Sequence, residues 1–196
     1  MPALPLAPLL EAPPVSHHDR AHVTLDWIES PLGRLVAGAT DTGVCLLEFS
    51  DPGRRDAQIG TLERRLGCAV TQGEHPLLPQ LGAELAEYFA GERRTFSVPL
   101  HYPGTEFQVR VWTALRAIPY GQTTSYEALA ATVSRPGAQR AVGKANGDNR
   151  IAIVIPCHRV VRKDGTLCGY GGGLWRKRRL LELERGLTTL ALDDAS

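Results

Sequence analysis

Alternating apolar and polar residues predict a small antiparallel meander near the start of the chain. Three short strands are expected at 23–28, 35–39 and 44–49. The turn sequences Pro31-Leu32-Gly33 and Asp41-Thr42-Gly43 separate them and carry the residue types that tight turns favour. The ordered part of the chain is therefore expected to begin with a sheet.

Helical spacing of apolar residues follows the predicted sheet. Two amphipathic helices are expected at 56–66 and 77–89, and Gly91 closes the second. Two prolines then indicate an extended linker over 97–104. We interpret everything before this linker as a scaffold.

A second set of helices is predicted after the linker. Over 105–118 the apolar side chains share one face, and Pro119-Tyr120-Gly121 ends that helix. Ser125 is expected to cap a helix that runs through Val133, and Pro136 to lie in the first turn of a third. The third helix has an expected apolar stripe of Ala138, Ala141, Val142 and Ala145, and an expected outer face of Gln139, Arg140, Gly143, Lys144, Asn146 and Gly147.

A short helix, a tight turn and a helix with a small, basic outer face together indicate a helix-turn-helix. Gly143 and Gly147 lower helix stability relative to alanine, which suggests that a phosphate backbone or another chain approaches closely. Packing against a neighbouring helix is the alternative. The predicted fold class is α/β, of the α+β kind: a small N-terminal antiparallel-sheet domain with helices, followed by a mainly helical C-terminal domain with a helix-turn-helix.

The expected domain boundaries follow from these elements. A disordered N-terminal arm spans 1–22, because this segment holds five prolines and little periodicity. The scaffold domain covers 23–100, the second domain covers 101–190, and a flexible tail covers 191–196. The arm lacks the basic and unbroken apolar regions of a secretory signal, and no apolar run reaches the roughly 18 residues of a membrane span. Neither export nor a membrane partner is therefore expected.

Composition is that of an ordinary globular protein, with 43% hydrophobic and 22% charged residues, and it excludes collagen-like or wholly disordered classes. The 196 residues carry 22 Lys and Arg against 21 Asp and Glu, which by itself argues against a nucleic-acid partner. The charge is unevenly distributed, however: net −5 over 1–100, +6 over 101–196 and +10 within 107–180. Such a basic segment is typical of phosphate binding, with a solvated basic surface as the alternative.

The four cysteines form no CxxC pair and no dense disulfide framework, which is typical of a reducing cytoplasm. His17, His18 and His22 could join Cys45 or Cys68 around a metal ion, but their spacing matches no zinc pattern. A solvated histidine cluster is expected instead, and no metal site.

Candidate chemistry is concentrated after residue 150. The apolar run 151–155 is expected to be a buried strand that leads directly to Cys157 and His158. Most cysteines in such a place are buried and inert. Here a proline breaks the strand, a histidine follows the cysteine, and Arg159 and Arg162 are close enough in sequence to favour a thiolate.

Four stretches of this chain resemble the O6-alkylguanine-DNA alkyltransferases: PYGQTTSYEALA, RPGAQRAVGKANGDN, IPCHRVV and GYGGGLWRKRRLLELERG. The resemblance is strong over residues 104–186, in the family's order and spacing, and loose over the preceding part of the chain. It implies a DNA repair protein that flips O6-alkylguanine out of the duplex and keeps the alkyl group on a cysteine.

The resemblance also implies a role for each matching residue. Cys157 matches the thiolate that attacks the alkyl carbon, His158 the residue that activates it through a water, and Glu184 the carboxylate that orients the imidazole. Asn149 matches the side chain that holds the active-site turn. Tyr126 matches the tyrosine that assists base rotation and protonates the leaving guanine.

Other matching positions surround these groups. In this family the recognition helix lies in the minor groove, and Arg140 matches the finger that fills the gap left by the flipped base. The expected DNA contacts are Arg140, Gln139, Lys144, Gly143, Thr124 and Ser125. The expected walls of the alkyl pocket are Tyr170, Gly171, Gly172 and Val160.

This chain departs from the family pattern at a few positions. Arg150 stands where a proline is usual, which bears on the stiffness of the turn and adds a cation near DNA. Lys144 and Asn146 replace small or apolar residues on the recognition helix. Cys168 is expected to be a small filler near the alkyl pocket, with a second modifiable thiol as the alternative.

The predicted function is therefore single-use transfer of an alkyl group from O6-alkylguanine in double-stranded DNA to Cys157, with O4-methylthymine as a further candidate substrate. No cofactor is expected, and the protein is expected to be a cytoplasmic monomer. The alternative is a non-catalytic lesion-recognising or regulatory helix-turn-helix protein, although relatives of that type lack the acceptor cysteine. A cysteine hydrolase is a distant third, because the sequence suggests no cleft for acyl transfer.

Overall fold

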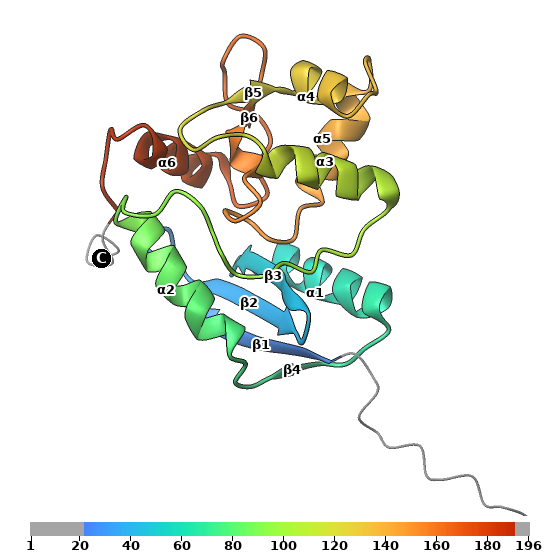
Figure 1. Cartoon of the computed structure of the whole chain (residues 1–196), viewed down its shortest axis with the longest axis vertical. Coiled ribbons are helices and arrows are strands. Elements are labelled where there is room, and N and C mark those ends of the chain that lie inside the picture. The colour runs from blue at the N-terminus through green and yellow to red at the C-terminus, as the bar shows by residue number, and fades with distance from the viewer. Residues whose placement is uncertain (1–21, 191–196) are drawn as a thin grey trace, which may run out of the picture.

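A four-stranded sheet forms the base of the computed structural model, which describes residues 22–190 (Figure 1). The strands are β1 (Val23–Ile28), β2 (Leu35–Thr40), β3 (Gly43–Phe49) and β4 (Val70–Gln72). They are ordered β3-β2-β1-β4. The first three pair antiparallel, which confirms the expected meander, and β4 adds a short parallel strand beside β1. With three residues, β4 is too short to give a periodic pattern in the sequence.

Two helices cover opposite faces of this sheet: α1 (Pro52–Leu66) and α2 (Leu77–Phe89). Leu62 of α1 packs with Val36 and Leu46 in one apolar cluster, while Leu81 of α2 packs with Leu47 in another. These sheet residues point to opposite faces because side chains alternate along a strand. The bounds of α2 are those expected. The first helix begins four residues earlier than expected, with a proline in its first turn, where no backbone donor is needed.

The remaining elements stack above the sheet (Figure 1). They are α3 (Glu106–Arg116), β5 (Thr124–Ser125), α4 (Tyr126–Thr132), α5 (Gln139–Gly147), the 3-10 turn η1 (Cys157–Arg159), β6 (Val160–Val161) and α6 (Leu174–Glu184). Thr105 and Gln108 form a capping box at the start of α3. Ser125 caps α4 as expected, accepting a hydrogen bond from the Ala128 amide at 3.1 Å.

The third predicted helix differs from expectation in two respects. Pro136 lies in a turn before α5, which begins only at Gln139. Ala141 is exposed, whereas Asn146, expected on the outer face, is 3% exposed. The Asn146 amide lies 3.5 Å from the Cys157 carbonyl, so a hydrogen bond accounts for burial that hydropathy could not predict.

Residues 151–155 are buried as expected, but they do not form the predicted strand. They form a compact turn that touches the sheet through one bridge between Ile151 and Leu47. Ile153 has a φ of +69°, and the Ile155 amide bonds back to the Ile151 carbonyl at 2.9 Å. Hydropathy predicts burial of an apolar run, but cannot distinguish a strand from a buried turn.

The linker is extended and lies along the edge of β3, where the Val44 amide donates to the Pro99 carbonyl at 2.8 Å. One apolar core then continues through both halves of the chain, from Leu47 of the sheet to Val142 of α5 and Leu180 of α6. The proposed arm and tail, apart from His22, lie outside the described residues. Within residues 22–190, no helix is long and apolar enough to cross a bilayer.

Candidate active site

Cys157 is the first residue of η1, immediately after the buried turn 151–155. Its side chain is almost enclosed, with 6% of the residue exposed. The Asn149 side-chain amide donates to Cys157 Sγ at 3.1 Å. Burial raises the pKa of the Cys157 thiol, while the hydrogen bond from Asn149 opposes that rise. The resting group is therefore a thiol, and a base must remove its proton before it can react as a nucleophile.

Asn149 also closes the turn that presents the cysteine. Its Nδ2 donates to the Ile155 carbonyl at 2.8 Å, and its Oδ1 accepts from the Ile151 amide at 3.0 Å. One side chain thus contacts both ends of the turn and the sulfur. These contacts fix the conformation of the turn.

His158 is fully buried and its Nε2 lies 2.8 Å from Glu184 Oε1. Because a carboxylate can only accept, Nε2 carries the proton and Nδ1 of the neutral ring is left as an acceptor. Nδ1 has no hydrogen-bond partner among the described residues. Burial lowers the pKa of His158, with Glu184 opposing, so the ring is held neutral and ready to accept a proton.

The Glu184 carboxylate is the centre of a hydrogen-bond network that the sequence analysis predicted only in part. Arg159 donates to both carboxylate oxygens at 2.9 Å, although it was expected to favour the thiolate. The Tyr88 hydroxyl donates at 2.8 Å and the Gly121 amide at 3.1 Å. Hydrogen bonds from His158 and Arg159 hold the pKa of Glu184 well below its usual range despite burial. The carboxylate therefore remains charged and fixed in orientation.

Lys177 is another buried charged residue. The sequence does not distinguish it from its neighbours, because it lies within a run of basic residues. It is 0% exposed, and its Nζ donates to the carbonyls of Val160 at 2.6 Å and Cys168 at 2.8 Å. Burial lowers the pKa of Lys177, and the neighbouring thiols of Cys168 and Cys157 oppose that shift. A positive charge here favours a thiolate at Cys157.

A cavity of about 190 Å³ adjoins Cys157. It is lined by Glu48, Arg54, Tyr126, Gly143, Asn146, Gly147, Asn149, Ala152, Cys157, Gly169, Tyr170, Gly171 and Gly172. The expected wall residues Tyr170, Gly171 and Gly172 therefore border the cavity. Val160 does not, and its carbonyl instead accepts from Lys177.

Two lining residues come from the scaffold half and were not predicted. Arg54 Nε donates to Glu48 Oε2 at 2.7 Å, and its Nη2 donates to the carbonyls of Gly147 and Asn149 at 3.1 and 3.3 Å. A Cβ at position 171 would overlap the Arg54 guanidinium, so a side chain there would require Arg54 to move. Neither residue belongs to a motif, so only the packing of the two halves brings them to the cavity.

Tyr126 begins α4 and borders the same cavity. Burial and the nearby Cys168 thiol raise the pKa of Tyr126, so its hydroxyl stays protonated. Cys168 is half-buried and adjoins this hydroxyl. Tyr126 is therefore available as a proton donor beside Cys157.

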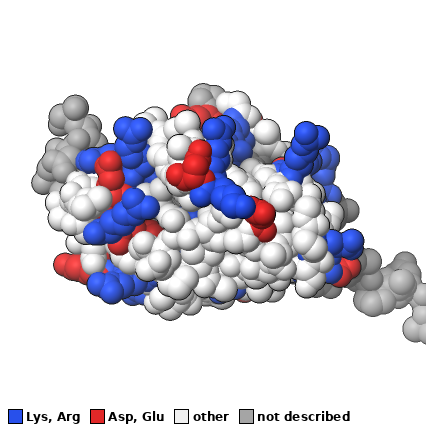
Figure 2. Space-filling model, turned by 90° about the horizontal axis from the view of Figure 1, so that it is seen from above, with Lys and Arg blue, Asp and Glu red and all other residues white. Residues whose placement is uncertain are grey.

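The residues expected to contact DNA lie around the helices α4 and α5. Gln139, Arg140 and Lys144 are exposed on α5, and Lys144 pairs with Asp148 at 3.1 Å. Gly143 lies against the Tyr126 ring at the cavity. Figure 2 shows the molecule from above, with Lys and Arg side chains spread around uncharged areas and fewer acidic side chains among them. Thr124 and Ser125 are half-buried in β5.

Arg150 is not the DNA-facing cation that the sequence suggested. It is 3% exposed, its guanidinium lies 5.1 Å from the centre of the Trp112 ring, and it donates to the Pro103 carbonyl. Burial lowers the pKa of Arg150 to about 10, which leaves it charged at neutral pH. Stacking on a tryptophan repays part of the cost of burying this cation.

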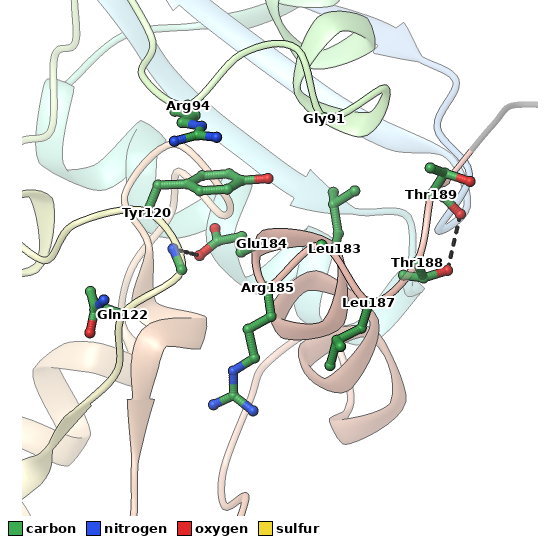
Figure 3. Close-up of a pocket in the computed structure, with 12 residues that line it drawn as sticks. Gly91, Arg94, Tyr120, Gln122, Leu183, Glu184, Arg185, Leu187, Thr188 and Thr189 are labelled. Carbon is green, nitrogen blue, oxygen red and sulfur yellow. Dashed lines mark hydrogen bonds between the residues drawn. The ribbon is translucent and has the colours of Figure 1, made fainter.

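A larger cavity of about 610 Å³ lies beside the network around Glu184 (Figure 3). Arg94 lies over the Tyr120 ring at one side of it, and the Gly121 amide bonds to Glu184. Its lining includes neither Cys157 nor His158. The smaller cavity is therefore the one in which the thiol can react.

Two family models match this chain: the ribonuclease-like domain of 6-O-methylguanine DNA methyltransferase over residues 24–102 and its DNA binding domain over residues 106–186. A methylated-DNA–protein-cysteine methyltransferase of Mycobacterium leprae is 44% identical over 169 residues, which cover 85% of this chain and 96% of the relative. The constitutive enzyme of that name from Bacillus subtilis is 42% identical over 161 residues, 80% of this chain and 92% of the relative.

Solved structures agree with these sequence relatives. The O6-methylguanine methyltransferase of Mycobacterium tuberculosis superposes with a TM-score of 0.72 at 40% identity, covering 87% of this chain and 98% of the other. The OGT of the same organism in complex with DNA superposes with a TM-score of 0.71 at 40% identity, covering 89% and 98%. With matches along nearly all of the described residues, this chain belongs to the 6-O-methylguanine DNA methyltransferase family.

Proposed function

We propose that this protein repairs O6-alkylguanine in double-stranded DNA by transferring the alkyl group to Cys157. One observation carries the proposal: Cys157 is the only cysteine lining the 190 Å³ cavity, and the next residue of the chain is a buried histidine paired with Glu184 at 2.8 Å. A nucleophile, a base and a group that orients the base therefore lie together. The names of the relatives given above describe the same activity.

The transfer step begins with loss of the thiol proton. His158 Nδ1 accepts this proton through a water, since its Nε2 is already committed to Glu184. The thiolate sulfur then attacks the alkyl carbon, and the bond between that carbon and guanine O6 breaks with its electron pair left on the guanine. Tyr126 gives the guanine a proton and recovers one from His158. The product is an S-alkylcysteine, so each molecule acts once.

The electrostatics around the sulfur support this sequence of steps. Glu184 stays charged because several donors hold it, and it stabilises the imidazolium that forms on His158. Lys177 supplies a fixed positive charge near Cys157 that favours the thiolate. Both effects lower the free energy of the charged state that precedes attack.

DNA binding is assigned to α4 and α5, which we propose act as a helix-turn-helix. Arg140 is exposed on α5, on the side that carries Gln139 and Lys144. Inserted into the duplex, the Arg140 side chain would replace part of the stacking lost when the damaged base leaves it. Extruding a base costs a few kcal/mol, and least for a poorly paired one, which favours lesions over intact guanine.

We further propose that residues 23–100 and 101–190 act as two domains of one working unit. The first half contributes Tyr88 to the Glu184 network and contributes Arg54 with Glu48 to the wall of the cavity. A scaffold that merely solubilised the second half would need none of these contacts. A monomer in the reducing cytoplasm fits a reaction that needs a free thiol, and Cys45, Cys68, Cys157 and Cys168 are all unpaired.

The test is a mass measurement on the full chain. After incubation with duplex DNA carrying a single O6-methylguanine, we expect one methyl group on the peptide that contains Cys157, and unmodified guanine in the DNA. Cys157→Ala is the control, and it should bind the same DNA without being modified. An unmodified Cys157 in wild-type protein that is bound to the lesion would contradict transfer and leave a lesion-binding protein.

A further inference from the structure

The turn that presents Cys157 contains a strained residue. Ile153, in the middle of 151–155, has a φ of +69°, a backbone conformation that crowds a β-branched side chain. Such strain persists only where surrounding contacts over-determine the conformation. The hydrogen bonds of the Asn149 side chain join the two ends of the turn and the Cys157 sulfur, so they all lie within one short segment. They close the turn, but they do not anchor it to the rest of the protein.

Arg150, between Asn149 and the turn, is anchored through both its backbone and its side chain. The Arg150 carbonyl accepts from the Leu47 amide of β3 at 2.8 Å. Its guanidinium donates to the Pro103 carbonyl of the linker and lies 5.1 Å from the centre of the Trp112 ring of α3. This one residue therefore ties the start of the turn to the sheet, to the linker and to α3.

The Trp112 ring on which Arg150 stacks is itself fixed. Trp112 is 1% exposed, and its Nε1 donates to the Ala145 carbonyl of α5 at 2.8 Å. The linker packs so closely that a Cβ added at Gly104 would lie 2.6 Å from the ring. A cation stacked on a ring with this little room is held in one place.

Stability does not account for Arg150. The residue is 3% exposed, and its Nε has no hydrogen-bond partner among the described residues. Burying a cation with an unpaired donor costs free energy that an apolar side chain of similar length would not. The placement of Arg150 is better explained by what it holds in position.

The charge of Arg150 is not what acts on the acceptor thiol. The titratable side chains that shift the pKa of Cys157, or whose own pKa it shifts, include Glu48 of β3, Arg54 of α1, Lys177 of α6, and the tyrosines Tyr126 and Tyr170. The Arg150 guanidinium lies at Trp112 instead. Burial raises the pKa of the thiol, and the hydrogen bond from Asn149 is the largest effect that opposes this rise. The position of Asn149 therefore matters more to the thiol than the charge of its neighbour.

We propose that Arg150 is a positioning residue for alkyl transfer: it anchors the strained turn to α3 and the linker, and so keeps the Asn149 amide on Cys157 Sγ. Without this anchor the backbone at Ile153 can relax, and the hydrogen bond from Asn149 to the sulfur is lost. That hydrogen bond stabilises the thiolate that attacks the alkyl carbon. The inference rests on the proposed function, because it names a residue that supports its nucleophile.

Arg150→Met tests this role, because methionine keeps an unbranched chain in the buried site and removes the cation. The pKa of Cys157 is measured from the pH dependence of its alkylation by iodoacetamide, followed by mass spectrometry on the peptide that contains it. We expect this pKa to rise by about one pH unit, as for loss of a hydrogen bond to a charged group. The rate constant of methyl transfer at neutral pH should then fall about tenfold, because the thiolate fraction falls tenfold, while the affinity for DNA stays unchanged.

Two further variants separate positioning from stability. Arg150→Lys keeps a cation over Trp112 and should restore both the pKa of Cys157 and the transfer rate constant to within about threefold of wild type. Leu62→Ala is the matched control, because it truncates a fully buried side chain of α1 that packs in a separate apolar cluster. It should destabilise the fold and leave both quantities at their wild-type values.

A double variant tests whether Arg150 acts through Asn149. In Asn149→Ala the hydrogen bond to the sulfur is absent, so adding Arg150→Met should raise the pKa of Cys157 no further. Should Arg150→Met fail to fold, Arg150→Gln takes its place, because it keeps a donor for the Pro103 carbonyl but no cation on Trp112.

Two outcomes would overturn the inference. An unchanged pKa of Cys157 and an unchanged transfer rate in Arg150→Met, despite lower stability, would leave Arg150 a purely structural role. An equal further rise of this pKa in the Asn149→Ala background would mean that Arg150 does not act through Asn149. Absence of methyl transfer in wild-type protein, by contrast, would contradict the proposed function, and the iodoacetamide measurement would still decide the role of Arg150.

Discussion

At the scale of single residues, this site depends on the protonation states of its buried ionisable groups. His158 is neutral because burial disfavours its charged form, and Glu184 is charged because Arg159, Tyr88 and the Gly121 amide donate to it. A neutral base beside a fixed carboxylate can accept a proton and then be stabilised as a cation. The same burial makes the folded protein sensitive to acid.

The pH dependence of stability should reveal the state of His158. Its pKa is lowered in the folded protein from an ordinary value of 6.5, so below that pH the unfolded chain binds more protons than the folded one. The free energy of unfolding should therefore decrease as pH falls below 6.5, until the folded pKa is reached. Urea unfolding of wild-type and His158→Gln protein across this range measures the effect. A pH slope that is identical in both would contradict a neutral, buried His158.

At the scale of elements, backbone turns place the chemistry. The turn at Gly121, between α3 and β5, has a φ of +75° and brings its amide to Glu184. A Cβ added there would lie 2.8 Å from the Glu184 carbonyl oxygen. Gly137, before α5, has a similar φ of +84° but open space around it. Comparing the two glycines therefore distinguishes the cost of a left-handed backbone, which both positions carry, from the cost of a steric clash, which only Gly121 carries.

Alanine at these two positions should destabilise the protein by different amounts. Gly137→Ala carries only the strain of a left-handed backbone, about 1 kcal/mol. Gly121→Ala adds the clash with the backbone of α6, and should cost at least about 1 kcal/mol more, in the range of overpacked sites. Chemical denaturation of both variants measures the difference. Equal losses would mean that the α3–β5 turn does not press against the end of α6.

At the scale of the whole molecule, the scaffold half takes part in the site of the second half. Tyr88 lies on α2, yet its hydroxyl and His158 Nε2 both bond to Glu184 Oε1 at 2.8 Å. Arg54 of α1 bonds to the carbonyls of Gly147 and Asn149. The acidic and basic halves therefore share one core and one reacting centre.

Tyr88→Phe tests this contribution, with Tyr88 as a positioning residue. We expect the rate of methyl transfer to fall about tenfold, and the free energy of unfolding by about 1–3 kcal/mol, because a buried carboxylate loses one donor. With less of its charge engaged, Glu184 should raise the pKa of His158, so the pH at which transfer is half-maximal should rise. Tyr102→Phe is the control, because it removes an exposed hydroxyl that accepts from Arg116 Nη1 at 3.3 Å. An unshifted pH profile would assign Tyr88 a purely structural role.

Local sequence patterns predicted most elements, and family motifs predicted the chemical groups of the site. The strands of the meander, the bounds of α2 and the Ser125 cap depend on neighbours along the chain, which periodicity and turn chemistry describe well. In the structure, the Asn149 side chain hydrogen-bonds to the sulfur of Cys157, and the His158 ring hydrogen-bonds to Glu184. Those positions came from family motifs, which record chemistry directly.

What only the tertiary structure decided depends on side-chain contacts that the hydropathy pattern does not describe. The run 151–155 folds as a turn because Asn149 hydrogen-bonds to both of its ends. Asn146 is buried where it hydrogen-bonds to the Cys157 carbonyl, and Arg150 is buried where its guanidinium stacks on Trp112. The sequence alone predicted which residues carry the chemistry, through their match to family motifs. Packing determined which polar groups share the cavity with them, because a buried polar side chain is stabilised by hydrogen-bond partners that hydropathy does not describe.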